Sequence, residues 1–199
     1  MTIVALSSSS LTMRCCASGI HKRGLATLSK SLSKTLSKTP PIFVYGSLLS
    51  GFPQHALLIS SSLEKAPVPA RASGFALAHF KEGGYPGMFP EPPLSTRWRH
   101  KAIVEGELMY LKVEEEAEVL ARLDKYEEFF GPHDERNQYE RVSILAHTSS
   151  EEHPTMVVAQ AYLCVAPDAM KKLGGTIITD GNWRRMMSAQ QNDAGTPLI

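Results

Sequence analysis

The sequence has few of the features that mark secreted, membrane-spanning or metal-holding proteins. It contains only three cysteines in 199 residues, and two of them, Cys15 and Cys16, are adjacent, so a disulfide framework is excluded. The third, Cys164, lies in an apolar run and is expected in the core. No apolar run reaches the ~18 residues of a membrane-spanning helix. These absences predict a soluble protein of a reducing compartment.

Acidic residues are absent from residues 1–40, which carry six lysines and arginines. The rest of the chain holds 15 basic and 20 acidic residues, a net charge of −5, so it offers no basic surface for nucleic acid. A basic, serine-rich, acid-free N-terminus is typical of a transit peptide, and a disordered tail is the alternative. We therefore expect an organellar protein (mitochondrial or plastid) if residues 1–40 are a transit peptide, and a cytoplasmic protein otherwise.

Residues 41–187 are expected to form one domain, followed by a polar C-terminal tail, 188–199. Helical spacing of apolar residues predicts the clearest helix at 113–127. Shorter helices are expected at 53–59, 167–173 and 181–186, and extended segments at 42–45, 64–80, 103–111, 139–145 and 156–165. Few strand connections contain a crossover helix. The predicted fold is therefore α+β, a small mixed, mostly antiparallel β-barrel with two or three flanking helices.

Two glycine-containing stretches are candidate binding elements. Ile42–Tyr45 is a buried-strand pattern that ends at Gly46 and Ser47. Glycine there permits a positive φ, and the N–H groups of Gly46, Ser47 and Leu48 could converge on an anion, or the stretch is an ordinary tight turn. Residues 83–87 have the composition of a turn. The proline after Tyr85 holds this tyrosine extended, so that its ring is presented at a fixed angle. The alternative is that Tyr85 is an ordinary loop residue.

Four motifs in order resemble those of the γ-glutamylcyclotransferase family, including its avirulence-induced-gene and γ-glutamylamine branches. They are Tyr45-Gly46-Ser47-Leu48, the Leu-Asp-x-x-Glu of Leu123–Glu127, the Tyr-x-Arg of Tyr139–Arg141, and Gly181-Asn182-Trp183-Arg184, where the family has Gly-Asp-Trp-Arg. The strand Glu105-Gly106-Glu107-Leu108 also resembles a family strand. The resemblance covers about residues 41–187.

The resemblance implies an enzyme that releases 5-oxoproline from a γ-glutamyl compound. The α-amine of the substrate attacks its own γ-carbonyl and expels an amine, so no catalytic serine, no catalytic cysteine, no metal and no cofactor are required. One carboxylate takes a proton from the attacking amine and returns it to the leaving amine, a task that burial suits by raising the pKa. The expected partner is a small γ-glutamyl substrate, with no nucleic acid and no membrane.

The resemblance assigns the catalytic carboxylate to Glu127. Glu128, the adjacent acid, is its rival. The family often has glycine at that position, so this sequence departs from the family there, and which acid faces the pocket stays open. Tyr45, Gly46, Ser47 and Leu48 are expected to bind the α-carboxylate of the substrate, with Tyr85 and Tyr139 as further candidates for its site. For Tyr139 the alternative is a structural role. Asp124 is expected to be a cap or an ion-pair partner, and Arg141 is expected to pair with a core acid. Trp183 is expected to be a lid or a packing residue. His55 and His79 are expected to be structural or surface residues.

Two alternatives to this enzyme remain open. One is a non-catalytic module that binds a γ-glutamyl or related small molecule, and the other is a related acyl transfer. The sequence does not distinguish a γ-glutamyl dipeptide, a γ-glutamyl-ε-lysine isopeptide and glutathione as substrates, and it leaves the oligomeric state unknown.

Overall fold

The computed structural model describes residues 39–80, 84–90, 102–149, 155–165 and 174–193. Residues Thr39–Ile199 form one compact unit. The helix expected at 167–173 lies outside the described residues, as do residues 1–38. Among the described residues, no helix is long and apolar enough to cross a membrane.

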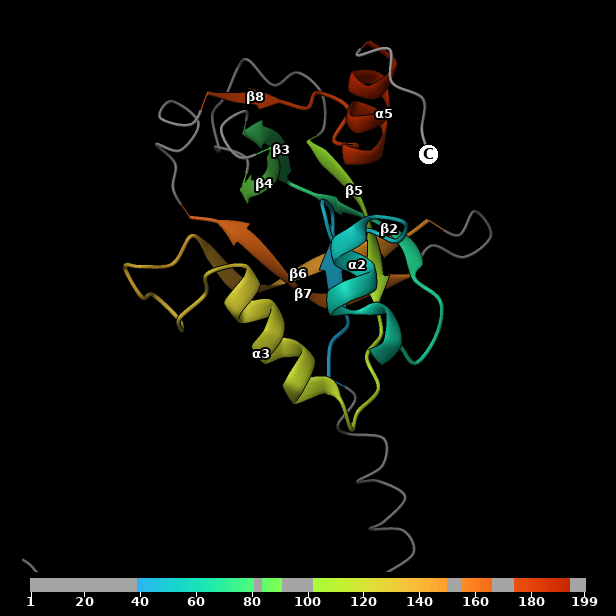
Figure 1. The fold of residues 1–199 in the computed structure, drawn as a ribbon, viewed down its shortest axis with the longest axis vertical. Coiled ribbons are helices and arrows are strands. Elements are labelled where there is room, and N and C mark those ends of the chain that lie inside the picture. Colours follow the sequence, from blue (N-terminus) through green and yellow to red (C-terminus); the bar gives the residue numbers. More distant parts are fainter. Residues whose placement is uncertain (1–38, 81–83, 91–101, 150–154, 166–173, 194–199) are drawn as a thin grey trace, which may run out of the picture. The chain divides into compact units, whose positions relative to one another are not determined.

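Five strands close into a barrel, as the sequence predicts (Figure 1). The order around the barrel is β1 (Ile42–Val44), β5 (Ile103–Met109), β2 (Val68–Ser73), β6 (Tyr139–Thr148) and β7 (Met156–Cys164). Neighbouring strands are antiparallel except β1 and β7, which meet in parallel at Ile42 and Gln160. The sheet is therefore mixed and mostly antiparallel.

The interior of the barrel is filled by small side chains. Five alanines on three of its strands are at most 2% exposed: Ala70, Ala72, Ala146, Ala159 and Ala161. A barrel of few strands has a narrow interior, which alanine fills without forcing the strands apart. Larger side chains close it, among them Phe43 and Leu108, a cross-strand pair of β1 and β5.

A second, three-stranded sheet corrects one prediction. It has the order β4 (Tyr85–Pro90), β3 (Phe75–Phe80), β8 (Gly175–Ile177), so the residues expected in a turn from Tyr85 onward begin a strand instead. Pro86 is tolerated because β4 is an edge strand, where one side of the backbone needs no ladder hydrogen bond. Position 87 requires glycine, because a Cβ there would overlap the ring of Phe80. The short strand β8 has no alternation of apolar and polar residues from which it could have been predicted.

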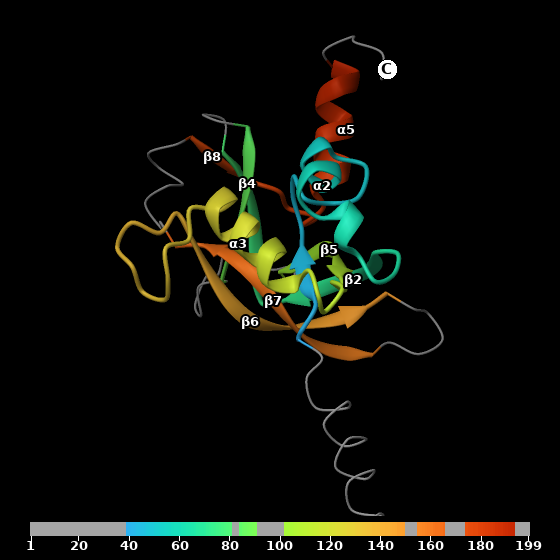
Figure 2. The same cartoon turned by 60° about the horizontal axis from the view of Figure 1, so that its bottom comes forward.

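Three α-helices and a short 3₁₀ turn, η1 (Ser60–Ser62), are present in the described residues: α2 (Pro53–Leu58), α3 (Glu116–Tyr126) and α5 (Trp183–Asp193). Helix α5 continues beyond the single turn expected at 181–186, since the residues after it are mostly good helix formers that tolerate solvent. Figure 2 shows α3 lying beside the β6–β7 hairpin. Val119 and Leu123 are its fully buried residues, and they fix which side of α3 faces the core.

Candidate active site

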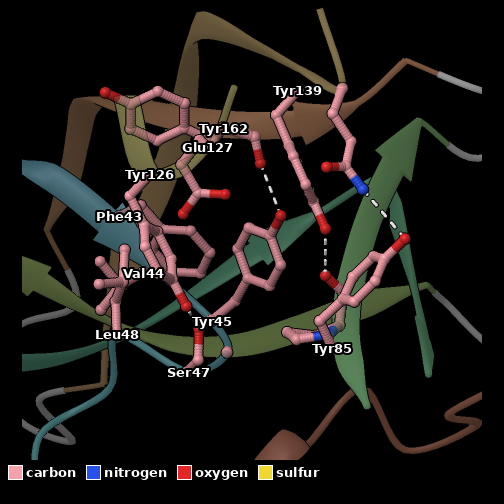
Figure 3. A pocket seen from close by; sticks show the side chains of 13 residues that line it. Phe43, Val44, Tyr45, Ser47, Leu48, Tyr85, Tyr126, Glu127, Tyr139 and Tyr162 are labelled. Atoms are coloured by element: carbon pink, nitrogen blue, oxygen red, sulfur yellow. Dashed lines mark hydrogen bonds between the residues drawn. The ribbon is translucent and has the colours of Figure 1, made fainter. Parts of the chain in front are cut away.

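A pocket of about 120 Å³ lies where the end of β1, the end of α3 and the starts of β4 and β6 meet (Figure 3). Six of the thirteen described residues that line it are aromatic: Phe43, Tyr45, Tyr85, Tyr126, Tyr139 and Tyr162. All seven residues that the sequence singles out as a candidate site line this one pocket: Glu127, Tyr45, Gly46, Ser47, Leu48, Tyr85 and Tyr139. Segments more than 80 residues apart in the sequence therefore share a single small cavity.

The end of helix α3 determines where its two adjacent acids lie. Phe129 N–H donates to the Asp124 carbonyl at 2.8 Å and Glu128 N–H donates to the Lys125 carbonyl at 3.4 Å, which together form a Schellman cap. This cap requires a left-handed residue after the C-cap, and Glu128 takes that position with a φ of 51°. The left-handed φ explains a preference for glycine there.

Glu127 and Glu128 consequently face different surroundings. Glu127, the C-cap residue, lines the aromatic pocket, and Figure 3 shows its carboxyl group pointing toward the Tyr45 ring. Glu128 is exposed and borders a separate, open depression with Phe130 and Arg136. Of the two acids that the sequence left open, Glu127 is the one in the pocket.

The carboxyl group of Glu127 has an unusual electrostatic environment. Burial raises its pKa from 4.5 to about 8, because the surrounding protein atoms disfavour the charged form. In the described part of the chain, no hydrogen bond or salt bridge engages this carboxyl group to offset that cost. It is the one Asp, Glu, Lys, Arg or His side chain among the described residues that line the pocket. A carboxyl group of this kind can both accept and donate a proton near neutral pH.

The buried tyrosines have their hydroxyl groups held by the main chain. The Tyr45 hydroxyl donates to the Tyr162 carbonyl at 2.6 Å and accepts from the Met88 N–H at 3.3 Å. The Tyr139 hydroxyl donates to the Pro86 carbonyl at 2.7 Å. Burial raises the pKa of both Tyr45 and Tyr139, so both stay neutral. They shape the pocket and are not candidates for its base.

Behind the pocket wall, Asp124 and Arg141 have the structural roles expected of them. The Tyr162 hydroxyl donates to Asp124 Oδ1 at 2.6 Å, and Arg141 Nη1 lies 3.5 Å from the same oxygen. The ion pair expected for Arg141 is thus confirmed. Trp183 is 2% exposed and packs against the ring of His79, so it is a packing residue and not a lid. His55 is buried, with Nδ1 3.1 Å from the Leu48 carbonyl oxygen.

The loop after β1 needs Gly46 for a reason other than the one predicted. Gly46 does not have a positive φ; instead, a Cβ at this position would overlap the ring of Pro86. Leu49 N–H donates to the Gly46 carbonyl at 3.0 Å and closes the turn. Within the described residues, no protein acceptor is bonded to the N–H groups of Gly46, Ser47 or Leu48. Three adjacent donors at the pocket are therefore available to an anionic group.

Six pocket residues were not singled out from the sequence as candidates for the site: Phe43, Val44, Pro86, Tyr126, Gln138 and Tyr162. The Tyr126 hydroxyl lies 3.1 Å from Ser47 Oγ at the exposed rim, and Gln138 Nε2 donates to the Tyr85 hydroxyl at 2.9 Å. Tyr126 precedes Glu127 in the sequence and Gln138 precedes Tyr139, so their position next to predicted site residues could have pointed to them. Nothing local marks Tyr162, which enters the pocket from the middle of β7.

In the described residues, no three His, Cys, Asp or Glu side chains are grouped so that they could hold a metal ion. The pocket is instead a mainly aromatic cavity with one carboxyl group and a row of main-chain N–H groups. This arrangement can orient a small zwitterionic group and transfer a proton within it.

Comparison with known proteins gives one curated relative with an assigned activity. It is the gamma-L-glutamyl-butirosin B gamma-glutamyl cyclotransferase of Niallia circulans, 33% identical over 115 residues. The match covers 57% of this chain and 62% of that protein, so the chain spans less than two thirds of the length of its relative.

Two solved structures are similar over most of the domain. A mouse AIG2-like protein is 22% identical with a TM-score of 0.48, covering 66% of this chain and 82% of that one. A protein specific to uropathogenic E. coli is 16% identical with a TM-score of 0.47, covering 75% and 95%. The family model described as gamma-glutamyl cyclotransferase, AIG2-like, matches residues 42–185, which include every residue of the candidate site. The chain therefore belongs to the AIG2-like gamma-glutamyl cyclotransferase family.

Proposed function

We propose that this protein is a γ-glutamylcyclotransferase that releases 5-oxoproline and an amine from a small γ-glutamyl substrate. The observation that carries the proposal is the Glu127 carboxyl group, with its pKa raised to about 8, in the same pocket as three main-chain N–H groups; among the described residues, neither the carboxyl group nor these N–H groups have a bonding partner. In the reaction the substrate α-nitrogen forms a bond to the γ-carbonyl carbon, and the bond from that carbon to the leaving nitrogen breaks. Counted from the neutral α-amine, the attacking nitrogen loses one proton and the leaving nitrogen gains one. An α-ammonium first gives up one further proton, which the released amine takes up when it becomes an ammonium.

Glu127 is the residue that moves this proton. As a carboxylate it accepts the proton from the attacking amine, and as a carboxylic acid it returns it to the departing amine. With a pKa of about 8, about a tenth of the molecules hold it ionised at pH 7, so both forms are populated. An exposed glutamate at its ordinary pKa would be a poor acid for the second transfer.

The loop after β1 supplies the binding of the γ-glutamyl group. Its α-carboxylate accepts hydrogen bonds from the N–H groups of Gly46, Ser47 and Leu48, because no arginine, lysine or histidine lines the pocket in the described residues. The α-ammonium then lies toward the Glu127 carboxyl group. Holding the amine against the carbonyl in this way can supply about 7–11 kcal/mol of the barrier reduction.

The size of the pocket supports a division of the substrate into two parts. A cavity of about 120 Å³ is smaller than the roughly 300–1,000 Å³ of pockets for whole drug-sized ligands. We infer that the γ-glutamyl group is enclosed, while the amine that leaves extends past the exposed rim formed by Ser47 and Tyr126. Substrates with different amines would then share one binding mode for the reacting half.

The test is 5-oxoproline release by the purified full-length protein from γ-glutamyl-alanine, γ-glutamyl-ε-lysine and glutathione, assayed for the wild type, Glu127→Gln and Glu128→Gln. We expect release from at least one substrate. Glu127→Gln should lower turnover by about 10²–10⁴-fold, the usual contribution of a general acid–base. Glu128→Gln should stay within a few-fold of the wild type, because its side chain lies outside the pocket.

Three results would contradict the proposal. Full turnover by a folded Glu127→Gln variant would remove Glu127 from the mechanism. Absence of release from every substrate, with a γ-glutamyl ligand still bound by the folded wild type, would instead favour a non-catalytic binding module. Transfer of the γ-glutamyl group to an added amine without 5-oxoproline would indicate a related acyl transfer.

A further inference from the structure

The Gly181–Arg184 motif lies directly against barrel strand β5. Glu105 N–H donates to the Gly181 carbonyl at 2.9 Å, and a Cβ on Gly181 would overlap the Ile103 carbonyl oxygen. Asn182 caps α5 by accepting the Arg185 N–H at 2.9 Å. The first turn of α5 is thereby fixed to β5, and the side chain of Arg184 reaches another residue of the same strand.

Arg184 and Glu107 form a network around one residue of the loop that follows β1. Arg184 Nη2 donates to Glu107 Oε1 at 2.8 Å and to Ser50 Oγ at 3.0 Å. Ser50 itself donates twice to the same carboxylate, from its N–H to Oε2 at 2.8 Å and from its hydroxyl to Oε1 at 2.7 Å. The guanidinium also lies 5.6 Å from the centre of the Phe52 ring. The Glu107 side chain is only 14% exposed and that of Arg184 is 42% exposed, so the carboxylate is the member of the pair that is shielded from solvent.

Ser50 is connected to the pocket by the hydrogen bonds of its own loop. Leu49 N–H donates to the Gly46 carbonyl at 3.0 Å, and Phe52 N–H donates to the Leu49 carbonyl at 3.1 Å. The loop is therefore a series of short turns, and anchoring Ser50 limits the movement of the residues just before it. Those residues carry the three free N–H groups at the pocket.

We propose that Arg184 and Glu107 are positioning residues that hold the Gly46–Leu48 main chain in the orientation that binds the γ-glutamyl group. Neither residue lines the pocket, so both act through Ser50. The effect of these residues on catalysis rests on the proposed function, whereas their anchoring of the loop is independent of it. The Gly-x-Trp-Arg motif thereby gains a function in addition to the packing of Trp183.

The expected consequence of losing the anchor is weaker substrate binding with unchanged proton transfer. Arg184→Met keeps the length and apolar stem of the side chain and removes the donors to Ser50 and Glu107. We expect kcat/KM to fall about 10–100-fold, mainly through KM, since misplacement of binding groups by about 1 Å has effects of this size. The pH at which kcat/KM changes should stay the same, because Glu127 is untouched. Arg184→Lys should recover part of the loss by keeping one charged donor.

Arg185→Met is the matched control. Arg185 is the next residue of the same helix turn, and its guanidinium pairs with Asp180 at 2.7 Å on the surface, with 66% of the arginine side chain exposed. This variant should retain the wild-type KM, kcat and pH profile. A similar loss in both variants would show a general effect on α5 and would overturn the positioning role.

Hydrogen exchange separates this proposal from the proposed function. In the full-length protein, Arg184→Met should exchange the hydrogen-bonded amides of Leu49, Ser50 and Phe52 faster than the wild type does, with β6 unchanged, and Arg185→Met should not. If the wild type releases no 5-oxoproline but this difference appears, the anchor stands and the proposed function fails. If the wild type is active and Arg184→Met matches it in exchange and in KM, the proposed function stands and the anchor is refuted.

Discussion

Glu127 and Glu128 are adjacent in the chain, yet their side chains line different depressions of the surface. The left-handed backbone of Glu128, with φ at 51°, turns the chain at the end of α3 and separates the two carboxyl groups. Glu127 is thereby left among aromatic side chains, with no ionic partner in the described part of the chain, and Glu128 remains exposed. The difference between these neighbours leads to two predictions that need no substrate.

The first concerns the pH dependence of stability. Because the folded state raises the pKa of Glu127 from 4.5 to about 8, it binds the proton more tightly than the unfolded state does. Its contribution to stability is complete below about pH 4.5 and is lost as the pH rises to about 8. In Glu127→Gln this loss is absent. The free energy of unfolding of the wild type should therefore fall relative to that of the variant by about 1.4 kcal/mol per pH unit across this interval.

Urea denaturation of both proteins at several values between pH 5 and pH 8 measures this difference. Glu128→Gln serves as the control, since its carboxyl group is exposed, and it should follow the wild type. Parallel curves for the wild type and Glu127→Gln would contradict the burial of the Glu127 carboxyl group.

The second prediction concerns the left-handed position itself. A residue other than glycine costs about 1–2 kcal/mol in this conformation. Glu128→Gly removes that cost and loses part of the gain to the greater flexibility of the unfolded chain. We expect a net stabilisation of about 0.5–1 kcal/mol by denaturant unfolding. Glu128→Ala, which lacks the charge but keeps the Cβ, should show no such gain, and equal gains in both would refute backbone strain as the cause.

A third prediction follows from the contact between Gly46 and Pro86. A Cβ on Gly46 would overlap the Pro86 ring, so Gly46→Ala should destabilise the protein by about 1–3 kcal/mol, as overpacking does. Pro86→Ala removes the overlapping ring atom and should reduce the cost of Gly46→Ala in the double variant. A double-mutant cycle measures this coupling. Additive effects would show that the glycine is needed for a different reason.

A fourth prediction concerns Asn182, where the family motif has aspartate. Asn182 Nδ2 donates to Glu105 Oε2 at 2.6 Å. Asn182→Asp would keep the cap of α5 but place two carboxylates together, and it should cost about 1–3 kcal/mol at pH 7. Adding Glu105→Gln restores a donor and should recover most of the loss, as measured by urea denaturation. A fully stable Asn182→Asp single variant would contradict this pairing.

The fifth prediction concerns residues 1–40, for which we propose import into an organelle. Their six basic residues and lack of acids are the basis of the proposal. Fused ahead of a fluorescent protein, residues 1–40 should direct it to mitochondria or plastids, whereas the fluorescent protein alone remains diffuse. A diffuse cytosolic signal from the fusion would refute the proposal.

The sequence by itself determined the elements that depend on local pattern. Four successive apolar residues predict β1, and the helical spacing of apolar residues along 113–127 predicts α3, because strand and helix periodicities are set by neighbours in the chain. The closed, mostly antiparallel barrel followed from the scarcity of crossover helices. The motifs also identified six residues that line one pocket, through family resemblance and not through spacing alone, and the proline after Tyr85 pointed to the seventh.

The tertiary structure decided what depends on residues distant in the sequence. Tyr85 begins a strand instead of a turn because β3 pairs with it, and Gly46 is required because Pro86 lies against it. The contact between Arg184 and Ser50 joins residues 134 positions apart. The raised pKa of Glu127 has the same origin: burial is a property of the surroundings, and the surroundings of Glu127 come from four separate strands that no local pattern brings together.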